Sequence, residues 1–247
     1  MRNVTDVDRL AARHRSPGQP VMHQDWGKLL FMHWRIEENL LRPHVPDSLE
    51  IDTYGDSAWI AITPFTMWDI RAFPPFVPPL PGLNSMHELN VRTYVHYNGV
   101  PGVWFFSLDA NNSAAVLAAR AFFHLPYYNA DIKMEGKKKI KYRLKRDDDP
   151  LAEFRADWSV GEALPQSQPG SREFFFTERY ILYTEWKGEL YRARIHHEPW
   201  QLYNAELTRF DSTMLEALPI TQPKTQPILH HAEEVNVDIW LPESVED

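Results

Sequence analysis

The chain contains 247 residues, of which 43% are hydrophobic and 24% are charged. These proportions are typical of a folded protein with a large core and exclude a disordered chain. Antiparallel proteins of this length are often single domains, so we expect one domain. The formal net charge of −8 repels nucleic-acid backbones. In the one basic run, Lys137 to Arg146, most charged residues alternate with apolar ones as in a half-exposed strand, so we predict no nucleic-acid partner.

The chain has no cysteine, which excludes disulfides, thiolate metal ligands and a thiol nucleophile. Its opening residues mix charged and apolar side chains, unlike a secretion signal. No later stretch approaches the roughly 20 apolar residues of a membrane-spanning helix. We therefore expect a cytoplasmic protein with no membrane partner.

Residues 1–23 are predicted to form an N-terminal helical extension, and residues 24–247 a single domain. Thr5 and Asp8 have the spacing of a capping box. This spacing favours a short peripheral helix, which Pro17 would end.

The remainder of the chain contains mainly strand patterns separated by turn residues. We predict strands at residues 28–36, 58–65, 87–97, 103–109, 139–145, 153–160, 180–186, 189–195 and 228–241. We predict helical turns at residues 39–44, a helix at 113–123 and a final helical turn at 211–218. The dipeptides Asn98-Gly99 and Lys187-Gly188 are predicted hairpin turns. Long strands with a few short helices indicate an antiparallel α+β fold.

Residues 74–81 are rich in proline, which cannot donate sheet hydrogen bonds and prefers an extended conformation. Two pairs of prolines have the PxxP spacing of an SH3-type ligand. The apolar Phe76 and Leu80 instead favour packing onto the same protein. We predict an ordered loop or arm.

One predicted strand carries polar residues on one face only. Glu88, Asn90, Arg92 and Tyr94 alternate with apolar or small residues, so the two sets point to opposite faces. Two interpretations remain open. The polar face lines a closed cavity, with Glu88 as acid/base, Asn90 as an orienting amide and Arg92 as an anion clamp, or it faces solvent and carries an ordinary ion pair.

Two segments resemble the acetoacetate decarboxylase family. Residues 34–51 contain an aromatic residue, an arginine, an acidic turn and a V-P-x-x-L-E-I exit, as that family does. The resemblance places Arg35 at the position of the family's cavity arginine, where it would hold a substrate carboxylate or carbonyl. A structural bridge to a carboxylate such as Glu88 is the alternative role for Arg35.

The second segment runs from Glu88 through a Y-N-G turn and Arg120 to Tyr127 and Tyr128. It is similar to the family stretch that begins with the catalytic-site glutamate and ends in a pair of lysines. The strings ELNVRTYV, GVWFFSLDA and LPYYNA resemble more closely a YqjF-like bacterial family of the same superfamily. The resemblance implies a mostly antiparallel, closed or cone-like sheet with a few short helices around a cavity.

The lysine pair is replaced by Tyr127 and Tyr128, which cannot form an imine with a substrate. The resemblance therefore implies a cavity without imine-based decarboxylation. The two tyrosines would donate hydrogen bonds to a bound oxygen or fill the volume of the lysines. Arg120, in the alanine-rich helix, is predicted to bond carbonyl groups of a neighbouring strand.

Two histidine pairs, at residues 196–197 and 230–231, are the sequence's candidate metal ligands. Adjacent residues of a strand point to opposite faces, so neither pair offers two ligands to one ion. We predict neither a metal nor a cofactor.

The sequence supports three functional hypotheses. The first is an enzyme of the lyase, hydratase or isomerase type, in which Arg35 and Arg92 hold a small oxygenated or anionic molecule and Glu88 moves a proton. The second is a non-catalytic protein that binds a small molecule in the same cavity. The third is an assembly protein that uses the proline-rich arm. Fold alone does not choose among them, because one fold can carry many functions. A homo-oligomer is compatible with all three hypotheses.

Overall fold

The computed structural model describes residues 4–72 and 85–246. The strands are β1 (Met22–Ile36), β2 (Glu50–Ile51), β3 (Ala58–Ala72), β4 (Ser85–Tyr97), β5 (Val100–Ala110), β6 (Tyr127–Glu135), β7 (Lys139–Arg146), β8 (Glu153–Ala163), β9 (Ile181–Trp186), β10 (Glu189–His196), β11 (Leu202–Ser212), β12 (Ile228–Ile239) and β13 (Glu243–Ser244). The helices are α1 (Asp6–Ala12), α2 (Glu38–Leu41), the 3-10 turn η1 (Arg42–His44), α3 (Ser113–Phe123) and α4 (Arg172–Thr177). The proline-rich residues 74–81 lie outside the described residues.

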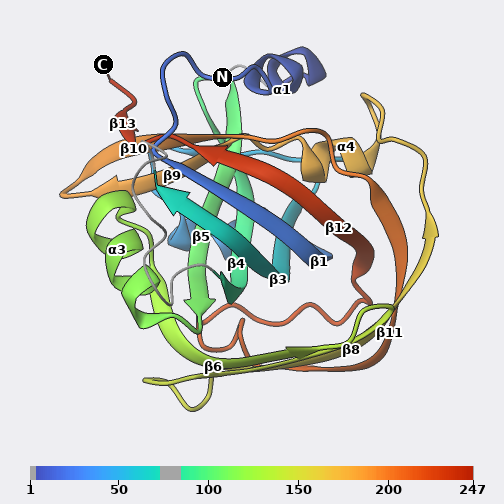
Figure 1. Ribbon diagram of the computed structural model, residues 1–247. Coiled ribbons are helices and arrows are strands. Elements are labelled where there is room, and N and C mark those ends of the chain that lie inside the picture. Colours follow the sequence, from blue (N-terminus) through green and yellow to red (C-terminus); the bar gives the residue numbers. More distant parts are fainter. Residues whose placement is uncertain (1–3, 73–84, 247) are drawn as a thin grey trace.

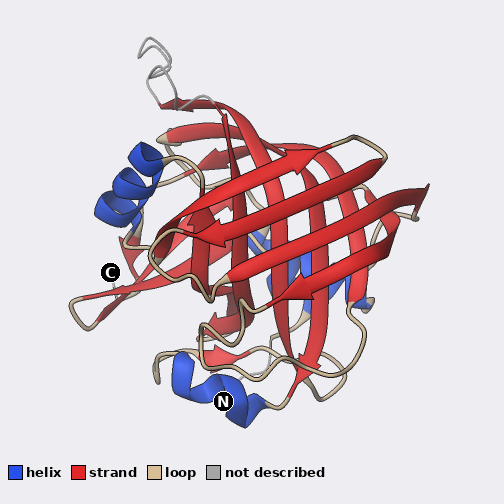
Figure 2. Ribbon diagram, turned by 90° about the horizontal axis from the view of Figure 1, so that it is seen from below, coloured by secondary structure: helices blue, strands red, loops and turns tan. Residues whose placement is uncertain are grey.

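All of these strands belong to one sheet, which coils into a cone-like shape (Figures 1 and 2). The strand order is β13-β10-β9-β5-β6-β7-β8-β11-β12-β1-β3-β4-β2, and β5 also pairs with β4 while β10 also pairs with β12. The pairs β5–β6 and β5–β9 are parallel, whereas the other strand pairs are antiparallel. The predicted α+β, mostly antiparallel and cone-like architecture is confirmed.

The two predicted hairpin turns join strands that are adjacent in the sheet. Asn98 and Gly99 both have positive φ, 50° and 82°, between β4 and β5. Lys187 and Gly188 have φ of 54° and 82° between β9 and β10. Positive φ at both central residues is the geometry whose twist matches the flanking strands, and glycine adopts it without steric cost.

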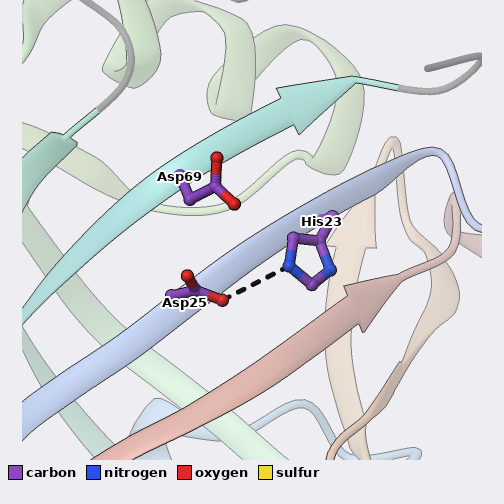
Figure 3. A group of neighbouring side chains, drawn as sticks. All are labelled: His23, Asp25 and Asp69. Atoms are coloured by element: carbon purple, nitrogen blue, oxygen red, sulfur yellow. Dashed lines mark ion pairs between the residues drawn. The ribbon is translucent and has the colours of Figure 1, made fainter.

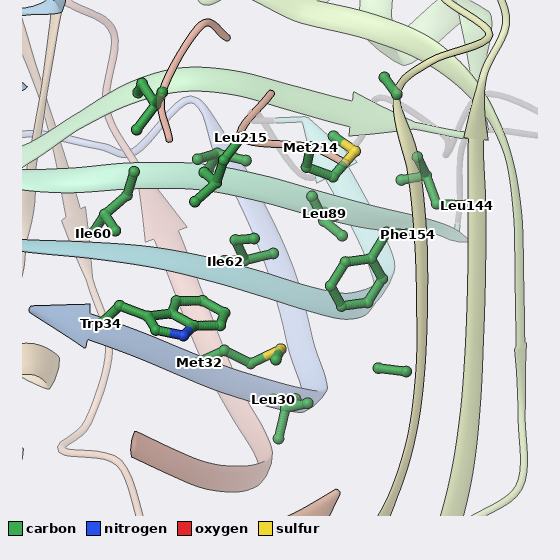
Figure 4. Close-up of a cluster of buried hydrophobic side chains, with 14 of the residues drawn as sticks. Leu30, Met32, Trp34, Ile60, Ile62, Leu89, Leu144, Phe154, Met214 and Leu215 are labelled. Carbon is green, nitrogen blue, oxygen red and sulfur yellow. The ribbon is translucent and has the colours of Figure 1, made fainter. Parts of the chain in front are cut away.

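One face of the β1, β3 and β4 part of the sheet is buried in a large hydrophobic core (Figure 4). Met32 and Trp34 of β1 and Ile62 of β3 pack there with Leu144 of β7 and Phe154 of β8. Burial of one such large side chain contributes about 1.5–3 kcal/mol to the free energy of unfolding. The core therefore holds the β1, β3 and β4 side of the cone against the β7 and β8 side.

The opposite face carries a second buried cluster. Phe31 of β1, Phe65 and Met67 of β3 and Leu108 of β5 contribute to it, together with Val116 of α3. Helix α3 is capped at its N-terminus by Asn112, whose side chain accepts a hydrogen bond from the Ala115 backbone. The helix flanks this face at one end of the cone (Figure 1). The cavity described below lies within this second cluster.

The N-terminal helix α1 starts with the predicted capping box. The Thr5 side chain accepts from the Asp8 backbone, and the Asp8 side chain accepts from the Thr5 backbone. Helix α1 is not purely peripheral, because its Arg9 side chain is buried and forms an ion pair with Asp52, next to β2. Strand β1 begins at Met22, just inside the segment predicted as an extension.

The helical turn predicted at residues 211–218 starts later, because β11 continues through Asp211 to Ser212. One turn follows, in which the Ala217 backbone N–H donates to the Thr213 carbonyl. Residues 214–219 form turns and not a longer helix. Strand β11 was absent from the prediction because most of its side chains are exposed or half-buried and polar, which weakens the strand pattern. Helix α4 was also missed, since the run Phe174–Phe176 is apolar on every face.

None of the helices described is long and apolar enough to span a membrane.

Candidate functional site

A cavity of about 460 Å³ lies between the cone's sheet and α3, within the 300–1,000 Å³ typical of small-molecule sites. Most of its lining side chains are apolar. Its polar lining side chains are Gln24, Thr63, Glu88, Asn90, Arg92, Tyr127, Thr177, Arg179 and His197. A mostly apolar cavity with a few converging polar groups is the usual form of a binding or active site.

Strand β4 supplies the polar groups predicted from its alternation. Glu88, Asn90 and Arg92 all line the cavity. Thr63 of β3 is the register partner of Asn90, and Tyr127 of β6 enters beside Leu108 of β5. The period of two residues in a strand therefore brings the three β4 side chains to one face.

Glu88 is the buried acid of this cavity, with 2% of its surface exposed. Burial raises the pKa of Glu88 to about 7, because the charged form loses its hydration. The Tyr127 hydroxyl donates to Glu88 Oε2 at 2.6 Å, and the Asn90 side chain also hydrogen-bonds to Glu88; both bonds lower the pKa. The resulting value allows Glu88 to gain and lose a proton near neutral pH.

The cavity has a basic end formed by Arg92 and Arg179. The Arg179 guanidinium carbon lies 4.6 Å from the Tyr94 ring centre, and that of Arg92 lies 5.6 Å from the Phe31 ring centre. No salt bridge joins Arg92 to Glu88 among the described residues. This end can therefore attract a negatively charged ligand group.

Arg179 is fixed by a buried charge network outside the cavity. Its Nη1 donates to Asp52 Oδ2 at 2.6 Å, and its Nε donates to the Phe175 carbonyl at 2.8 Å. Arg9 of α1 donates to both Asp52 oxygens at 2.9 and 2.8 Å. Two guanidinium groups thus share one carboxylate, which leaves an excess of positive charge behind the basic end.

Four polar atoms of lining residues are buried without a hydrogen-bond partner among the described residues: Thr63 Oγ1, Asn90 Oδ1, Arg92 Nε and Arg179 Nη2. A buried polar atom without a partner costs about 1–3 kcal/mol. Arg92 Nε and Arg179 Nη2 are donors on cations. Asn90 Oδ1 is an amide oxygen and can only accept, while the amide nitrogen of Asn90 is the group that hydrogen-bonds to Glu88. These unpartnered atoms are matched by a ligand that carries both an anionic and a donor group.

Tyr128 does not line the cavity with Tyr127. Successive residues of a strand point to opposite faces, and the Arg146 guanidinium stacks 3.9 Å from the Tyr128 ring centre on the other face. Arg146 also forms a buried ion pair with Asp109 at 2.7 Å. Arg120 donates to the Tyr127 carbonyl at 2.7 Å, which confirms its predicted structural bond.

Arg35 is placed away from the cavity, which corrects the expectation that Arg35 and Glu88 share one site. Arg35 is exposed and pairs with Trp59 on β3, while Glu88 pairs with Phe65. Six residues of strand span about 20 Å, so the two side chains start far apart. The Arg35 guanidinium instead lies 5.3 Å from the Trp59 ring centre. We exclude Arg35 from the site.

Sequence reasoning missed Thr63 and Arg179 as lining residues, and it considered His197 only as a metal ligand. Arg179 follows an apolar run of three phenylalanines, and such a charge in apolar surroundings is a signal that could have been noticed. Burial lowers the pKa of His197 to about 4, so its ring is neutral at physiological pH. His197 therefore acts as a hydrogen-bonding group and not as a cation.

One group of candidate metal ligands was not predicted from the sequence. Ligand atoms of His23, Asp25 and Asp69 lie within 4.8 Å of one another (Figure 3). His23 Nδ1 is 3.1 Å from an Asp238 oxygen and its Nε2 is 3.3 Å from Asp25, which also accepts from Asn236. Both ring nitrogens thus have carboxylate neighbours, and we interpret the group as a partly buried charge network.

The predicted histidine pairs make contacts within the protein. Nδ1 of His196 lies 3.1 Å from the Arg13 carbonyl, and that of His197 lies 2.8 Å from the Glu198 carbonyl. His230 lies 3.5 Å from Glu173, while His231 accepts from Trp158.

The raised pKa of Glu88 predicts how stability depends on pH. Between the ordinary pKa of 4.5 and about 7, the unfolded chain releases this proton while the folded protein keeps it. The free energy of unfolding should therefore fall as pH rises, by about 1.4 kcal/mol per pH unit and about 3 kcal/mol in all. The Glu88→Gln variant should not show this fall of the free energy of unfolding with pH. Denaturant unfolding of both proteins from pH 4 to 8 checks it; parallel curves would contradict the raised pKa.

Comparisons with known proteins agree with this architecture. The chain is 44% identical over 221 residues to the uncharacterized protein YqjF of Bacillus subtilis (strain 168), covering 89% of this chain and 90% of that protein. Residues 23–236 match the DUF2071 family, described as an uncharacterized conserved protein.

Solved structures with a similar fold include three enzymes or enzyme-like proteins. The enduracididine biosynthesis enzyme MppR, complexed with pyruvate, is 13% identical with a TM-score of 0.64, over 92% of this chain and 91% of that one. Acetoacetate decarboxylase from Legionella pneumophila is 12% identical with a TM-score of 0.60, over 94% and 90% of the two chains. An acetoacetate decarboxylase-like enzyme from Sphingomonas wittichii RW1 is 10% identical with a TM-score of 0.63, over 94% and 97%.

At such identities these structures show the fold alone, and that fold is the predicted acetoacetate decarboxylase-like one. The family match spans most of the chain, and the B. subtilis protein is similar over nearly its whole length. The chain is therefore a YqjF-like member of the DUF2071 family with an acetoacetate decarboxylase-like fold.

Proposed function

We propose that this protein is a cofactor-independent enzyme that moves a proton on a small oxygenated, anionic molecule. Glu88 is the acid/base, and Arg92 and Arg179 hold the anionic group. The observation that carries the proposal is a buried carboxyl group with a pKa of about 7 in the same cavity as two guanidinium groups with unpartnered nitrogens. Acid/base catalysis is most effective when the pKa lies near the working pH.

The proposed step uses the carboxylate form of Glu88 to remove a proton from a carbon next to a carbonyl or carboxylate group. The protonated Glu88 then returns the proton to another atom of the same molecule. Tyr127 holds the Glu88 carboxylate in place, and the two arginines stabilise negative charge that develops on the substrate oxygens. Isomerisation uses this step in full. In elimination of water the returned proton goes to the departing hydroxyl oxygen, and hydration is the reverse of that reaction.

No lysine is among the described residues that line the cavity, so these residues offer no side-chain amine that could form an imine with a substrate. This agrees with the replacement of the lysine pair by Tyr127 and Tyr128. One structure with a similar fold was solved as a complex with pyruvate, an anionic oxo acid of the proposed chemical class. The two proteins share 13% identity, so this likeness supports the class of ligand only.

A second candidate function is non-catalytic binding of a small molecule. It is favoured by the mainly apolar lining of the cavity, which suits retention of a ligand. In that case Glu88 would act only as a hydrogen-bonding partner of the ligand.

Solvent deuterium exchange separates the two candidates. The protein is incubated in heavy water with 2-oxo, 3-oxo and 3-hydroxy carboxylic acids, and deuterium on carbon is followed by NMR. We expect protein-dependent exchange whose rate rises with pH up to about 7, because Glu88 must be unprotonated to accept a proton. Binding of these acids without exchange in any of them would support the binding protein and overturn the enzyme.

A further inference from the structure

Among the described residues, the cavity has one buried end and one end whose lining side chains reach the surface, which we call the open end. Along β3, Thr63 and Phe65 are buried, Ile70 is half-buried and Ala72 is exposed, and all four line the cavity. Nine residues of strand span about 30 Å, so the cavity is elongated in this direction. The depth of a lining residue can therefore be inferred from its position along β3 and its register partners.

Charged groups occupy the buried end. Glu88 pairs with Phe65, Asn90 with Thr63, and Arg92 lies two residues farther from the open end on β4. Arg179 is also buried. Three of the four unpartnered atoms belong to Thr63, Asn90 and Arg92, so the unmatched hydrogen-bonding capacity lies deep in the cavity.

The open end is mainly apolar, and Gln24, which hydrogen-bonds to Met22 and Trp26, is a polar lining side chain there. The apolar lining of this end includes Met22, Met67, Ile70, Met86, Phe122 and Leu241. Met67 pairs with Met86, and Met22 pairs with Ala72, so these side chains lie beyond Glu88 towards the opening. Phe122 on α3 and Leu241 after β12 are 65% and 52% exposed, so the apolar lining continues to the protein surface there.

From this polarity we propose that the ligand is an amphipathic carboxylic acid. Its carboxylate lies at the buried end with Arg92 and Arg179, and its apolar chain or ring extends past Met67 and Met86 to Phe122. A hydroxyl group near the carboxylate would donate to Asn90 Oδ1, which has no partner among the described residues. The proposal rests on the proposed anion-binding role of the two arginines and adds the apolar body of the substrate.

Calorimetric binding of butanoate, hexanoate, octanoate and decanoate tests the proposal, with the matching 1-alkanols as uncharged probes. Each buried methylene contributes about 0.8 kcal/mol, so affinity should increase roughly fourfold per methylene along the series. The carboxylate should bind at least about tenfold more tightly than its alcohol, since hydrogen bonds to charged groups are worth about 1.5–3 kcal/mol. Arg92→Gln should remove most of this difference.

Two exposed residues of α3 provide a matched pair of variants. Phe122→Ser should weaken decanoate binding and leave butanoate unchanged, because Phe122 lines the open end. Leu117→Ser should change neither, because Leu117 is 69% exposed and is not among the lining residues. Circular dichroism of both variants shows whether α3 remains folded.

Each outcome decides one part of the proposal. Equal affinity for short and long acids, still dependent on Arg92, would overturn the amphipathic ligand and leave the proposed acid/base function intact. Equal affinity for acids and alcohols would overturn the anion site, on which both proposals depend. Absence of binding by all four acids to the folded protein would overturn both as well. Weaker decanoate binding to Phe122→Ser alone would support the orientation.

Discussion

Asp52→Asn is expected to lower the free energy of unfolding by about 3–5 kcal/mol, the typical loss when one partner of a buried ion pair is removed. Arg9, Asp52 and Arg179 each have no more than 5% of their surface exposed. Asparagine keeps the shape of Asp52 but leaves two guanidinium groups without a counter-charge. Chemical denaturation at pH 7 measures the loss.

Asp69→Asn is the matched control for this substitution. Asp69 pairs with Arg71, but the two side chains are 41% and 50% exposed, so the loss should be about 0–1 kcal/mol. The double variant Asp52→Asn/Arg9→Met should recover part of the loss, because it removes one of the two uncompensated charges. A loss below about 1 kcal/mol for Asp52→Asn would show that this network is hydrated and does not fix Arg179.

Glu88→Gln is expected to slow the deuterium exchange by about 10²–10⁴-fold, the usual contribution of a positioned acid/base. Glutamine resembles the protonated form of Glu88, and Asn90 can turn its amide to present Oδ1 to the new donor. Acid binding should therefore change little while exchange is lost. NMR exchange rates and calorimetric affinities of the same samples give the two readings.

Asn90→Asp serves as a comparison for Glu88→Gln. A second carboxylate beside Glu88 should raise its pKa further, because two like charges disfavour ionisation. Exchange should then require a higher pH without being abolished. Equal exchange rates for Glu88→Gln and the unchanged protein would assign proton transfer to another group.

The strand faces of the site could be predicted from the sequence because alternation in a strand is a local property. Glu88, Asn90 and Arg92 reach the cavity through the two-residue period alone. Tyr127 was predicted as a site residue only from the resemblance to the lysine-bearing family. That resemblance gives the position of Tyr127 in the chain but does not predict which side chains surround it. Thr63 reaches Asn90 only through the register of β3 with β4, which no local pattern encodes.

Arg35 shows where the resemblance fails. The matched segment identifies the correct strand, but β1 has an irregularity between Gly27 and Met32, with Lys28 at a φ of 51°. Arg35 follows this irregularity and lies four residues, about 13 Å, beyond Phe31, the lining residue nearest to it on β1. A match of residue types therefore could not establish how far along β1 Arg35 lies from the cavity.

The central claim is that Glu88 exchanges its proton near neutral pH inside the cavity. Titration of the Glu88 carboxyl carbon by ¹³C NMR, assigned by comparison with Glu88→Gln, tests it most directly. We predict an inflection at about pH 7, moved to higher pH in Tyr127→Phe, which lacks the hydrogen bond to the charged form. An inflection near 4.5, the ordinary glutamate value, would contradict the claim.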